Sequence, residues 1–225
     1  MDAISYCHKG DIRPINEDRV LVKKYTVGKQ HWGLFLVADG MGGGRGGIAS
    51  QTIVDVVSSW WDNDLATILS MPYTLEMVAD SLDVAIAAAN SKILALQTNK
   101  PIGSTLSLLL TVGGEYIARH IGDTRIYLVG ETLQQLTTDH DITHCLGTKQ
   151  FPSIQKICGE YTPQQRFFLC SKGYYQLVPN QTIFAILQHS AQDQKLIHLQ
   201  QAIPPGAASS NLSIIATTSS QGGDV

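Results

Sequence analysis

The segment around residue 39 combines an acidic side chain with a run of glycines. Asp39 ends an apolar stretch, and six glycines follow within the eight positions from Gly40 to Gly47. A carboxylate beside bare backbone suits a hard divalent cation, because carboxylate and carbonyl oxygens can both bind it. The alternative is a flexible turn with one solvated aspartate. A nucleotide-binding loop is disfavoured, since no Lys-Ser or Lys-Thr follows the glycines.

Two further acidic segments could contribute to the same site. The first, from Arg13 to Asp18, ends in the pair Glu17-Asp18, and the second places Asp123 after Gly122 in a turn between two apolar strands. Taken alone, the first is an ordinary charged loop, and an aspartate in such a turn usually caps its own backbone. These carboxylates acquire a chemical role only if the fold brings them to Asp39.

The elements that must position these residues follow from the hydrophobic pattern. Alternation and β-branched residues predict strands over 3–8, 20–27, 31–38, 104–112, 116–121, 125–129, 133–137, 167–171 and 212–217. Helical spacing predicts long helices over 47–62 and 75–97, the second with Thr74 as N-cap, and short helices over 180–189 and 193–202. Short turns predict that the four strands between 104 and 137 form one antiparallel meander. Residues 139–165 are irregular. Along the chain, strands come first, then two long helices, then more strands. This order indicates an α+β layered sandwich.

Composition limits the function further. The chain has 225 residues, of which 44% are apolar and 16% charged, so it can bury a sizeable core and is not mainly disordered. The net charge of −3 gives no basic excess for nucleic acid or an anionic membrane. No membrane span or signal peptide is predicted, and the four cysteines lack a C-x-x-C spacing. A soluble cytoplasmic protein is the expectation.

Seven short motifs occur in one order along the chain. They are Arg13 to Asp18, Asp39-Gly40-Met41-Gly42-Gly43, Gly103-Ser104-Thr105, His120 to Leu128, Leu136-Thr137-Thr138-Asp139-His140, Cys170-Ser171-Lys172-Gly173 and Ser210-Asn211-Leu212-Ser213. Together they resemble the motifs of the metal-dependent protein phosphatase 2C family, also called the PPM type.

The resemblance implies a fold and a reaction. The fold is a four-layer α-β-β-α sandwich of two antiparallel sheets flanked by helices, in a single domain over 1–218 with a shortened flap at about 141–165 and a mobile tail over 219–225. The reaction is hydrolysis of phosphoserine or phosphothreonine by a metal-activated water at a site holding Mn²⁺ or Mg²⁺. The implied partner is a phosphorylated protein.

The resemblance also implies residue roles by position. Arg13 would bind the substrate phosphate, since its planar fork matches two phosphate oxygens. Asp39 would bridge two metals and the Gly40 carbonyl would bind one of them. Glu17 and Asp18 would ligate a metal or hold its waters, and Asp123 would serve a third, weaker metal.

Two positions depart from the family pattern. Lys172 stands where the family's C-S-D-G motif has aspartate, and Ser210 stands where its D-N motif has aspartate, before Asn211. An ammonium and a divalent cation a few Å apart repel by several kcal/mol. We therefore expect fewer bound ions than the family norm, with Lys172 in or near the vacated site and its charge paired with Asp39.

Two functions remain open at this point. The first is a protein serine/threonine phosphatase with reduced or altered metal use, favoured by Arg13, Asp39 and the glycine loop. The second is a pseudophosphatase that binds a phosphoprotein or a regulatory partner without turnover, favoured by Lys172 and Ser210.

Overall fold

Apolar runs form the central strands of two five-stranded antiparallel sheets in the computed structural model, which describes residues 1–141 and 143–218. Sheet A has the order β1 (Asp2–His8), β12 (Leu212–Thr218), β11 (Arg166–Cys170), β8 (Arg125–Val129) and β9 (Leu133–Gln135). Sheet B has the order β10 (Gln155–Glu160), β7 (Glu115–Ile121), β6 (Leu106–Val112), β3 (Gln30–Ala38) and β2 (Arg19–Val27). A short pair, β4 (Gly40–Met41) and β5 (Gly103–Ser104), stands apart from both.

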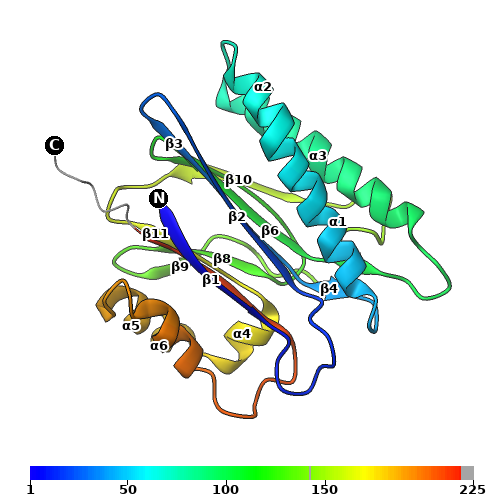
Figure 1. The fold of residues 1–225 in the computed structure, drawn as a ribbon, viewed down its shortest axis with the longest axis vertical. Coiled ribbons are helices and arrows are strands. Elements are labelled where there is room, and N and C mark those ends of the chain that lie inside the picture. Colours follow the sequence, from blue (N-terminus) through cyan, green and yellow to red (C-terminus); the bar gives the residue numbers. More distant parts are fainter. Residues whose placement is uncertain (142, 219–225) are drawn as a thin grey trace.

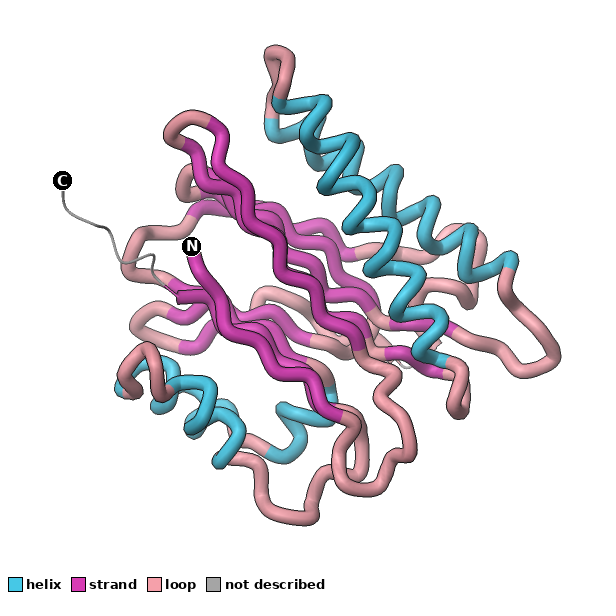
Figure 2. The backbone as a smooth tube through the Cα atoms, in the orientation of Figure 1, coloured by secondary structure: helices cyan, strands magenta, loops and turns pink. Residues whose placement is uncertain are grey.

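Helices cover the outer face of each sheet (Figures 1 and 2). Over sheet B lie α1 (Gly46–Ser59), the π-helical stretch η1 (Trp60–Leu65), α2 (Ala66–Leu69) and α3 (Leu75–Ala95). Over sheet A lie α4 (Lys172–Leu177), α5 (Asn180–His189) and α6 (Lys195–Gln201). The four-layer α-β-β-α sandwich that the resemblance implies is therefore present. None of the helices in the described ranges is both long and apolar enough to cross a bilayer.

The period of two along β3 explains the layering. Leu34 and Leu36 pack in the cluster under α1 and α3, whereas Phe35 and Val37 pack between the two sheets. Successive side chains of a strand point to opposite faces. A strand buried on both faces has no polar side chain along its buried length, as in β3 from Trp32 to Ala38.

The predicted elements are largely present. The strand over 125–129 and the helix over 180–189 have the predicted bounds. The N-cap prediction is also confirmed, because the Thr74 side chain accepts a hydrogen bond of 3.2 Å from the Met77 amide. Helix α4 and strand β10 were not predicted from the sequence, and β10 lies inside the stretch that was expected to be irregular. The tail over 219–225 lies outside the described residues.

The predicted single meander is wrong. β6 and β7 form a hairpin in sheet B, and β8 and β9 form a hairpin in sheet A. The turn at Gly122-Asp123 carries the chain from one sheet to the other. Gly122 has a φ of +104°, which side chains rarely adopt, and a Cβ there would lie 2.5 Å from the Thr105 side chain. A glycine is thus required where the chain changes sheets.

Candidate active site

The end of β3 fixes the backbone of Asp39. The Asp39 amide donates to Thr105 Oγ1 at 2.9 Å, and the Asp39 carbonyl accepts from the Thr105 amide at 3.0 Å. Ser104 Oγ donates to the same carbonyl at 3.1 Å. The Gly103-Ser104-Thr105 motif therefore holds Asp39 in place, and the β4–β5 pair continues this contact by placing Gly40 opposite Ser104.

The glycine loop after Asp39 is packed against its own ends. A Cβ on Gly40 would overlap the Gly46 carbonyl and lie 2.6 Å from the Glu17 carbonyl oxygen. Glu17 Oε1 accepts hydrogen bonds from the amides of Gly44 at 3.2 Å and Gly46 at 2.5 Å. Glu17 thus binds the amides at the start of α1, where a negative charge is stabilised.

The Asp18 carboxylate is fully buried, and only one of its two oxygens accepts a hydrogen bond from a described residue. Its Oδ2 accepts a hydrogen bond of 2.8 Å from Ser213 Oγ, whereas Oδ1 is buried with no partner among the described residues. Burial raises the pKa of Asp18 to about 6, against the lowering effect of the Ser213 hydrogen bond. The sequence did not identify Ser213 as a site residue, although it is the last position of the motif that begins at Ser210.

The carboxylates around Asp39 repel one another. Burial raises the pKa of Asp39 well above its usual range, and the negative charges of Asp18 and Asp123 raise it further. A buried carboxylate without a compensating positive charge is costly, so this arrangement favours a bound cation.

Lys172 is at the N-terminal end of α4 and reaches the turn between the sheets. Its Nζ lies 2.9 Å from Asp123 Oδ2, in an ion pair whose side chains are 41% and 11% exposed. The hydrogen bond with Asp123 raises the pKa of Lys172, and the charge of Asp39 contributes less. The predicted pairing with Asp39 is therefore wrong, because the end of β11 places the lysine nearer to the start of β8.

The two departures from the family pattern lie side by side. A Cβ on Gly173 would lie 3.2 Å from Ser210 Cβ, so the start of α4 contacts the loop before β12. The next residue, Asn211, accepts from the Glu17 amide at 2.9 Å and donates to the carbonyls of Lys9 and Ile15. Asn211 thus fastens the loop that carries Glu17.

Arg13 lies exposed on this same loop. Its Nε donates to the Ser209 carbonyl at 3.3 Å, beside Ser210. The guanidinium is therefore exposed to solvent beside the loop that precedes β12.

His140 supports the turn that carries Asp123. The Gly122 amide donates to His140 Nδ1 at 3.2 Å, and the His140 amide donates to the Gly122 carbonyl at 2.8 Å. The ring also stacks on the buried ring of His120, with centroids 5.2 Å apart. Sequence reasoning placed His140 in a motif without assigning this contact.

The residues beside Asp39 fit a divalent cation. The unpartnered Oδ1 of Asp18 and the mutual repulsion of Asp18 and Asp39 suit a divalent ion beside Asp39. Ser210 and Lys172 add no carboxylate to this set, since the Lys172 ammonium has no lone pair with which to bind a cation and is paired with Asp123. Over 1–141 and 143–218, no three His, Cys, Asp or Glu side chains are grouped closely enough to hold one metal.

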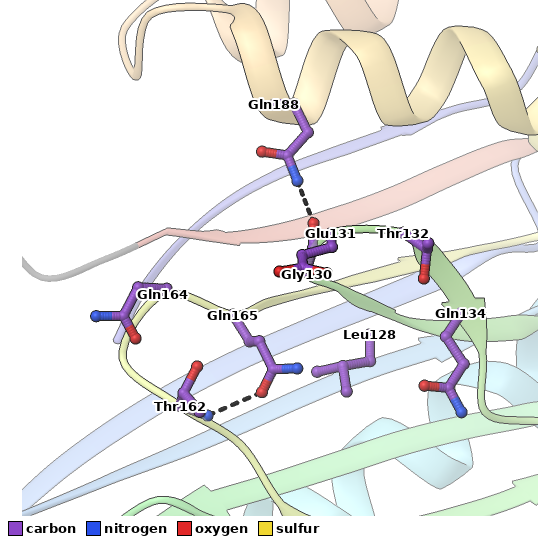
Figure 3. Close-up of a pocket in the computed structure, with 9 residues that line it drawn as sticks. All are labelled: Leu128, Gly130, Glu131, Thr132, Gln134, Thr162, Gln164, Gln165 and Gln188. Atoms are coloured by element: carbon purple, nitrogen blue, oxygen red, sulfur yellow. Dashed lines mark hydrogen bonds between the residues drawn. The ribbon is translucent and has the colours of Figure 1, made fainter.

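One cavity lies away from these carboxylates. It has a volume of about 550 Å³ and is lined mainly by Gln and Thr side chains around the β8–β9 turn (Figure 3). Gln188 donates to the Gly130 carbonyl across it, and Gln165 Oε1 accepts from the Thr162 amide at 2.9 Å. Because β8 runs from Arg125 to Val129, this cavity is at the opposite end of the strand from Asp123.

Comparison with known proteins adds to this geometry. A family model described as protein phosphatase 2C matches residues 14–201. The protein phosphatase PhpP of Streptococcus pneumoniae is 33% identical over 141 residues, which is 60% of this chain and 53% of PhpP, so the match spans about half of PhpP. The structure of the S. agalactiae serine/threonine phosphatase matches with a TM-score of 0.82 at 24% identity, over 96% of this chain and 98% of that one. The catalytic domain of the serine/threonine protein phosphatase PstP, solved with two manganese ions, matches with a TM-score of 0.75 at 26% identity, over 95% and 96%.

Proposed function

This chain belongs to the protein phosphatase 2C family, and from that membership we propose that it hydrolyses phosphoserine or phosphothreonine in proteins with fewer bound metal ions than the family norm. The observation that carries the proposal is the set of carboxylates at the end of β3. Asp39 is held there by Thr105, with the buried Asp18 and its unpartnered oxygen close by.

Different residues of the chain would bind the phosphate and the metal ion. Arg13, accessible on the loop fastened by Asn211, would bind the phosphate through a planar fork of donors. Asp39, Asp18 and the Gly40 carbonyl would hold a divalent Mn²⁺ or Mg²⁺, with Glu17 fixing the glycine loop beside them. When bound, such an ion supplies a more acidic water and neutralises charge on the transferring phosphoryl group.

Reduced metal use is supported by the Lys172–Asp123 pair. Asp123 is the position to which the resemblance assigns a third metal, and its carboxylate accepts the Lys172 ammonium at 2.9 Å. A divalent ion at Asp123 would have to displace that ammonium or be repelled by it. Ser210, next to Gly173, offers no charge to replace the absent aspartate.

The same two residues favour a second candidate function. If the remaining ligands hold no metal, the protein would be a pseudophosphatase, a module that binds a phosphoprotein or a regulatory partner without turnover. Fold alone does not decide between the two functions, because catalysis depends on the site.

Hydrolysis assays separate the two functions. Purified protein is incubated with p-nitrophenyl phosphate and with a phosphothreonine peptide, in Mn²⁺, in Mg²⁺ and in EDTA, beside an Asp39→Asn variant. We expect metal-dependent turnover that disappears in the variant. Absence of turnover in every metal, with the peptide still bound, would support the pseudophosphatase.

Calorimetric titration tests the number of ions. We expect wild type to bind fewer Mn²⁺ ions than a Lys172→Asp/Ser210→Asp double variant, which restores both carboxylates of the family pattern. Equal stoichiometry in the two proteins would contradict reduced metal use while leaving the phosphatase proposal in place.

A further inference from the structure

A groove lies on the outer face of sheet B, beyond the cover of its helices. Its volume is about 470 Å³, and it is bounded by the first turns of α3 and by outward residues of β7 and β10. Among the described strands, β10 pairs with β7 and with no other, so it forms an edge of sheet B. Figure 1 shows α1 and α3 side by side across this sheet. The groove therefore begins where the helical layer ends.

The groove has an apolar wall and floor. Leu75 and Ala79 of α3 form one side, and Ile117 of β7 lies against them. Cys158 of β10 is paired in register with Ile117, so both side chains point to the same face. Ile117 is 6% exposed, whereas the Cys158 thiol is free and exposed.

One end of the groove is acidic. Glu160 of β10 lies directly opposite Glu115 of β7, and Glu76 of α3 joins them in the lining. Like charges at opposed positions destabilise a strand pair. Within 1–141 and 143–218, none of these three glutamates forms an ion pair with a lysine, arginine or histidine.

The other end of the groove is basic. Arg119 Nε and Lys156 Nζ both contact Asp83, at 2.5 and 2.6 Å. Two positive charges on one carboxylate leave a net charge of +1, in contrast to the −3 of the three glutamates. The groove thus has an apolar middle between ends of opposite charge.

We propose that this groove binds a peptide segment of another protein, in which a few apolar side chains separate a basic end from an acidic residue. The basic end would lie against Glu76, Glu115 and Glu160 and relieve their repulsion. The acidic residue would lie against Arg119 and Lys156. Apolar contact supplies most of the affinity in such grooves, and the charges fix the direction of the segment.

The groove is separate from the candidate active site around Asp39, and strand β10 connects the two. Gln155, the first residue of β10, accepts a hydrogen bond of 3.0 Å from the Thr138 amide, two residues before His140. Glu160, the last residue, is at the acidic end. The six residues of β10 span about 20 Å at ~3.3 Å per residue. A segment bound here would leave Asp39 and Arg13 free.

The test uses two labelled synthetic peptides and fluorescence anisotropy. The first has the sequence Glu-Leu-Ala-Leu-Val-Lys-Arg, and the second, in which the basic end is replaced by an acidic one, is Glu-Leu-Ala-Leu-Val-Glu-Glu. We expect the first to bind at least tenfold more tightly. A Glu115→Gln/Glu160→Gln variant should lose that preference, while a Glu131→Gln/Asp193→Asn variant, which removes two exposed charges elsewhere, should keep it.

Two further measurements locate the contact and exclude other occupants. Bound peptide should slow the alkylation of Cys158 by iodoacetamide, and mass spectrometry measures the rate of that alkylation. The rate of p-nitrophenyl phosphate hydrolysis should be equal in wild type and the glutamate variant. Equal binding of both peptides, or unchanged binding by the variant, would overturn the proposal. A dimer that forms with increasing concentration and disappears in the variant would overturn it in favour of a second copy of this chain.

Discussion

The Lys172–Asp123 ion pair allows a quantitative test of how the charge of Asp123 is compensated. Removing one partner of a buried ion pair costs about 3–5 kcal/mol, whereas an exposed pair contributes about 0–1 kcal/mol. Here the carboxylate side chain is 11% exposed and the lysine side chain 41%. We therefore expect Lys172→Met to lower the free energy of unfolding by about 1–2 kcal/mol in EDTA, which is roughly 2–8 °C in Tm for a chain of this length.

A double-mutant cycle isolates the pair from other effects of the substitution. Urea unfolding of wild type, Lys172→Met, Asp123→Asn and the double variant should give a coupling energy of about 1–2 kcal/mol. Lys149→Met, at an exposed position, serves as the control and should change little. A coupling energy below about 0.3 kcal/mol would refute the reasoning, because it would mean that the ammonium does not compensate the charge of Asp123.

Two other predictions concern the glycine loop and the pH dependence of stability. Gly40→Ala should destabilise the fold by more than about 3 kcal/mol in urea unfolding, since its Cβ would overlap the Gly46 carbonyl, whereas Gly43→Ala, at φ +57° with open space around it, should cost only about 1–2 kcal/mol. Similar losses in the two variants would contradict the packing described for the loop. Burial acts to raise the pKa of Asp83, but hydrogen bonds from Arg119 and Lys156 outweigh it and hold that pKa below its usual range. The ion pairs of Asp83 therefore stabilise the fold at pH values above about 3.9, the pKa of an aspartate in the unfolded chain. This stabilisation is lost as the pH falls through the lower pKa that Asp83 has in the folded protein. Asp83→Asn should thus be less stable than wild type by about 1–2 kcal/mol at pH 6, with the gap closing below about pH 4, and a gap that is constant from pH 6 to pH 3 would contradict this.

The individual elements could be predicted because their signals are local. The strand over 125–129 has apolar residues bounded by turn residues on both sides, and the helix over 180–189 follows Pro179. β10 was missed because an edge strand with the sequence from Gln155 to Glu160 alternates only weakly between apolar and polar residues. Helix α4 is six residues long and too short to show a period.

The choice of sheet is a different kind of information. The turns at Gly113-Gly114 and Gly122-Asp123 look alike in sequence, but the first closes a hairpin and the second connects two sheets. Whether a turn closes a hairpin or connects two sheets depends on which faces of the strands pack together. That packing is determined by contacts between residues far apart in the chain.

The site shows the same limit. The order of the motifs identified Asp39, Asp18 and Asp123 as neighbours, and the coupling of their charges agrees with that interpretation. The partner of Lys172 depends instead on where β11 ends relative to β8, which a motif does not specify. The role of Thr105 in holding Asp39 likewise follows from the β4–β5 pair rather than from any local pattern.

The turn at Gly122-Asp123 has a consequence for how the protein acquires its site during folding. Each hairpin beside it can form early from residues close in the chain, but Asp39 directly follows a strand of sheet B, whereas Lys172 begins the helix that follows a strand of sheet A. Contacts between residues so distant in sequence form late, after the loop between them has been closed. A chain whose sheets have formed but have not yet docked would therefore carry every residue of the site and still lack the site itself.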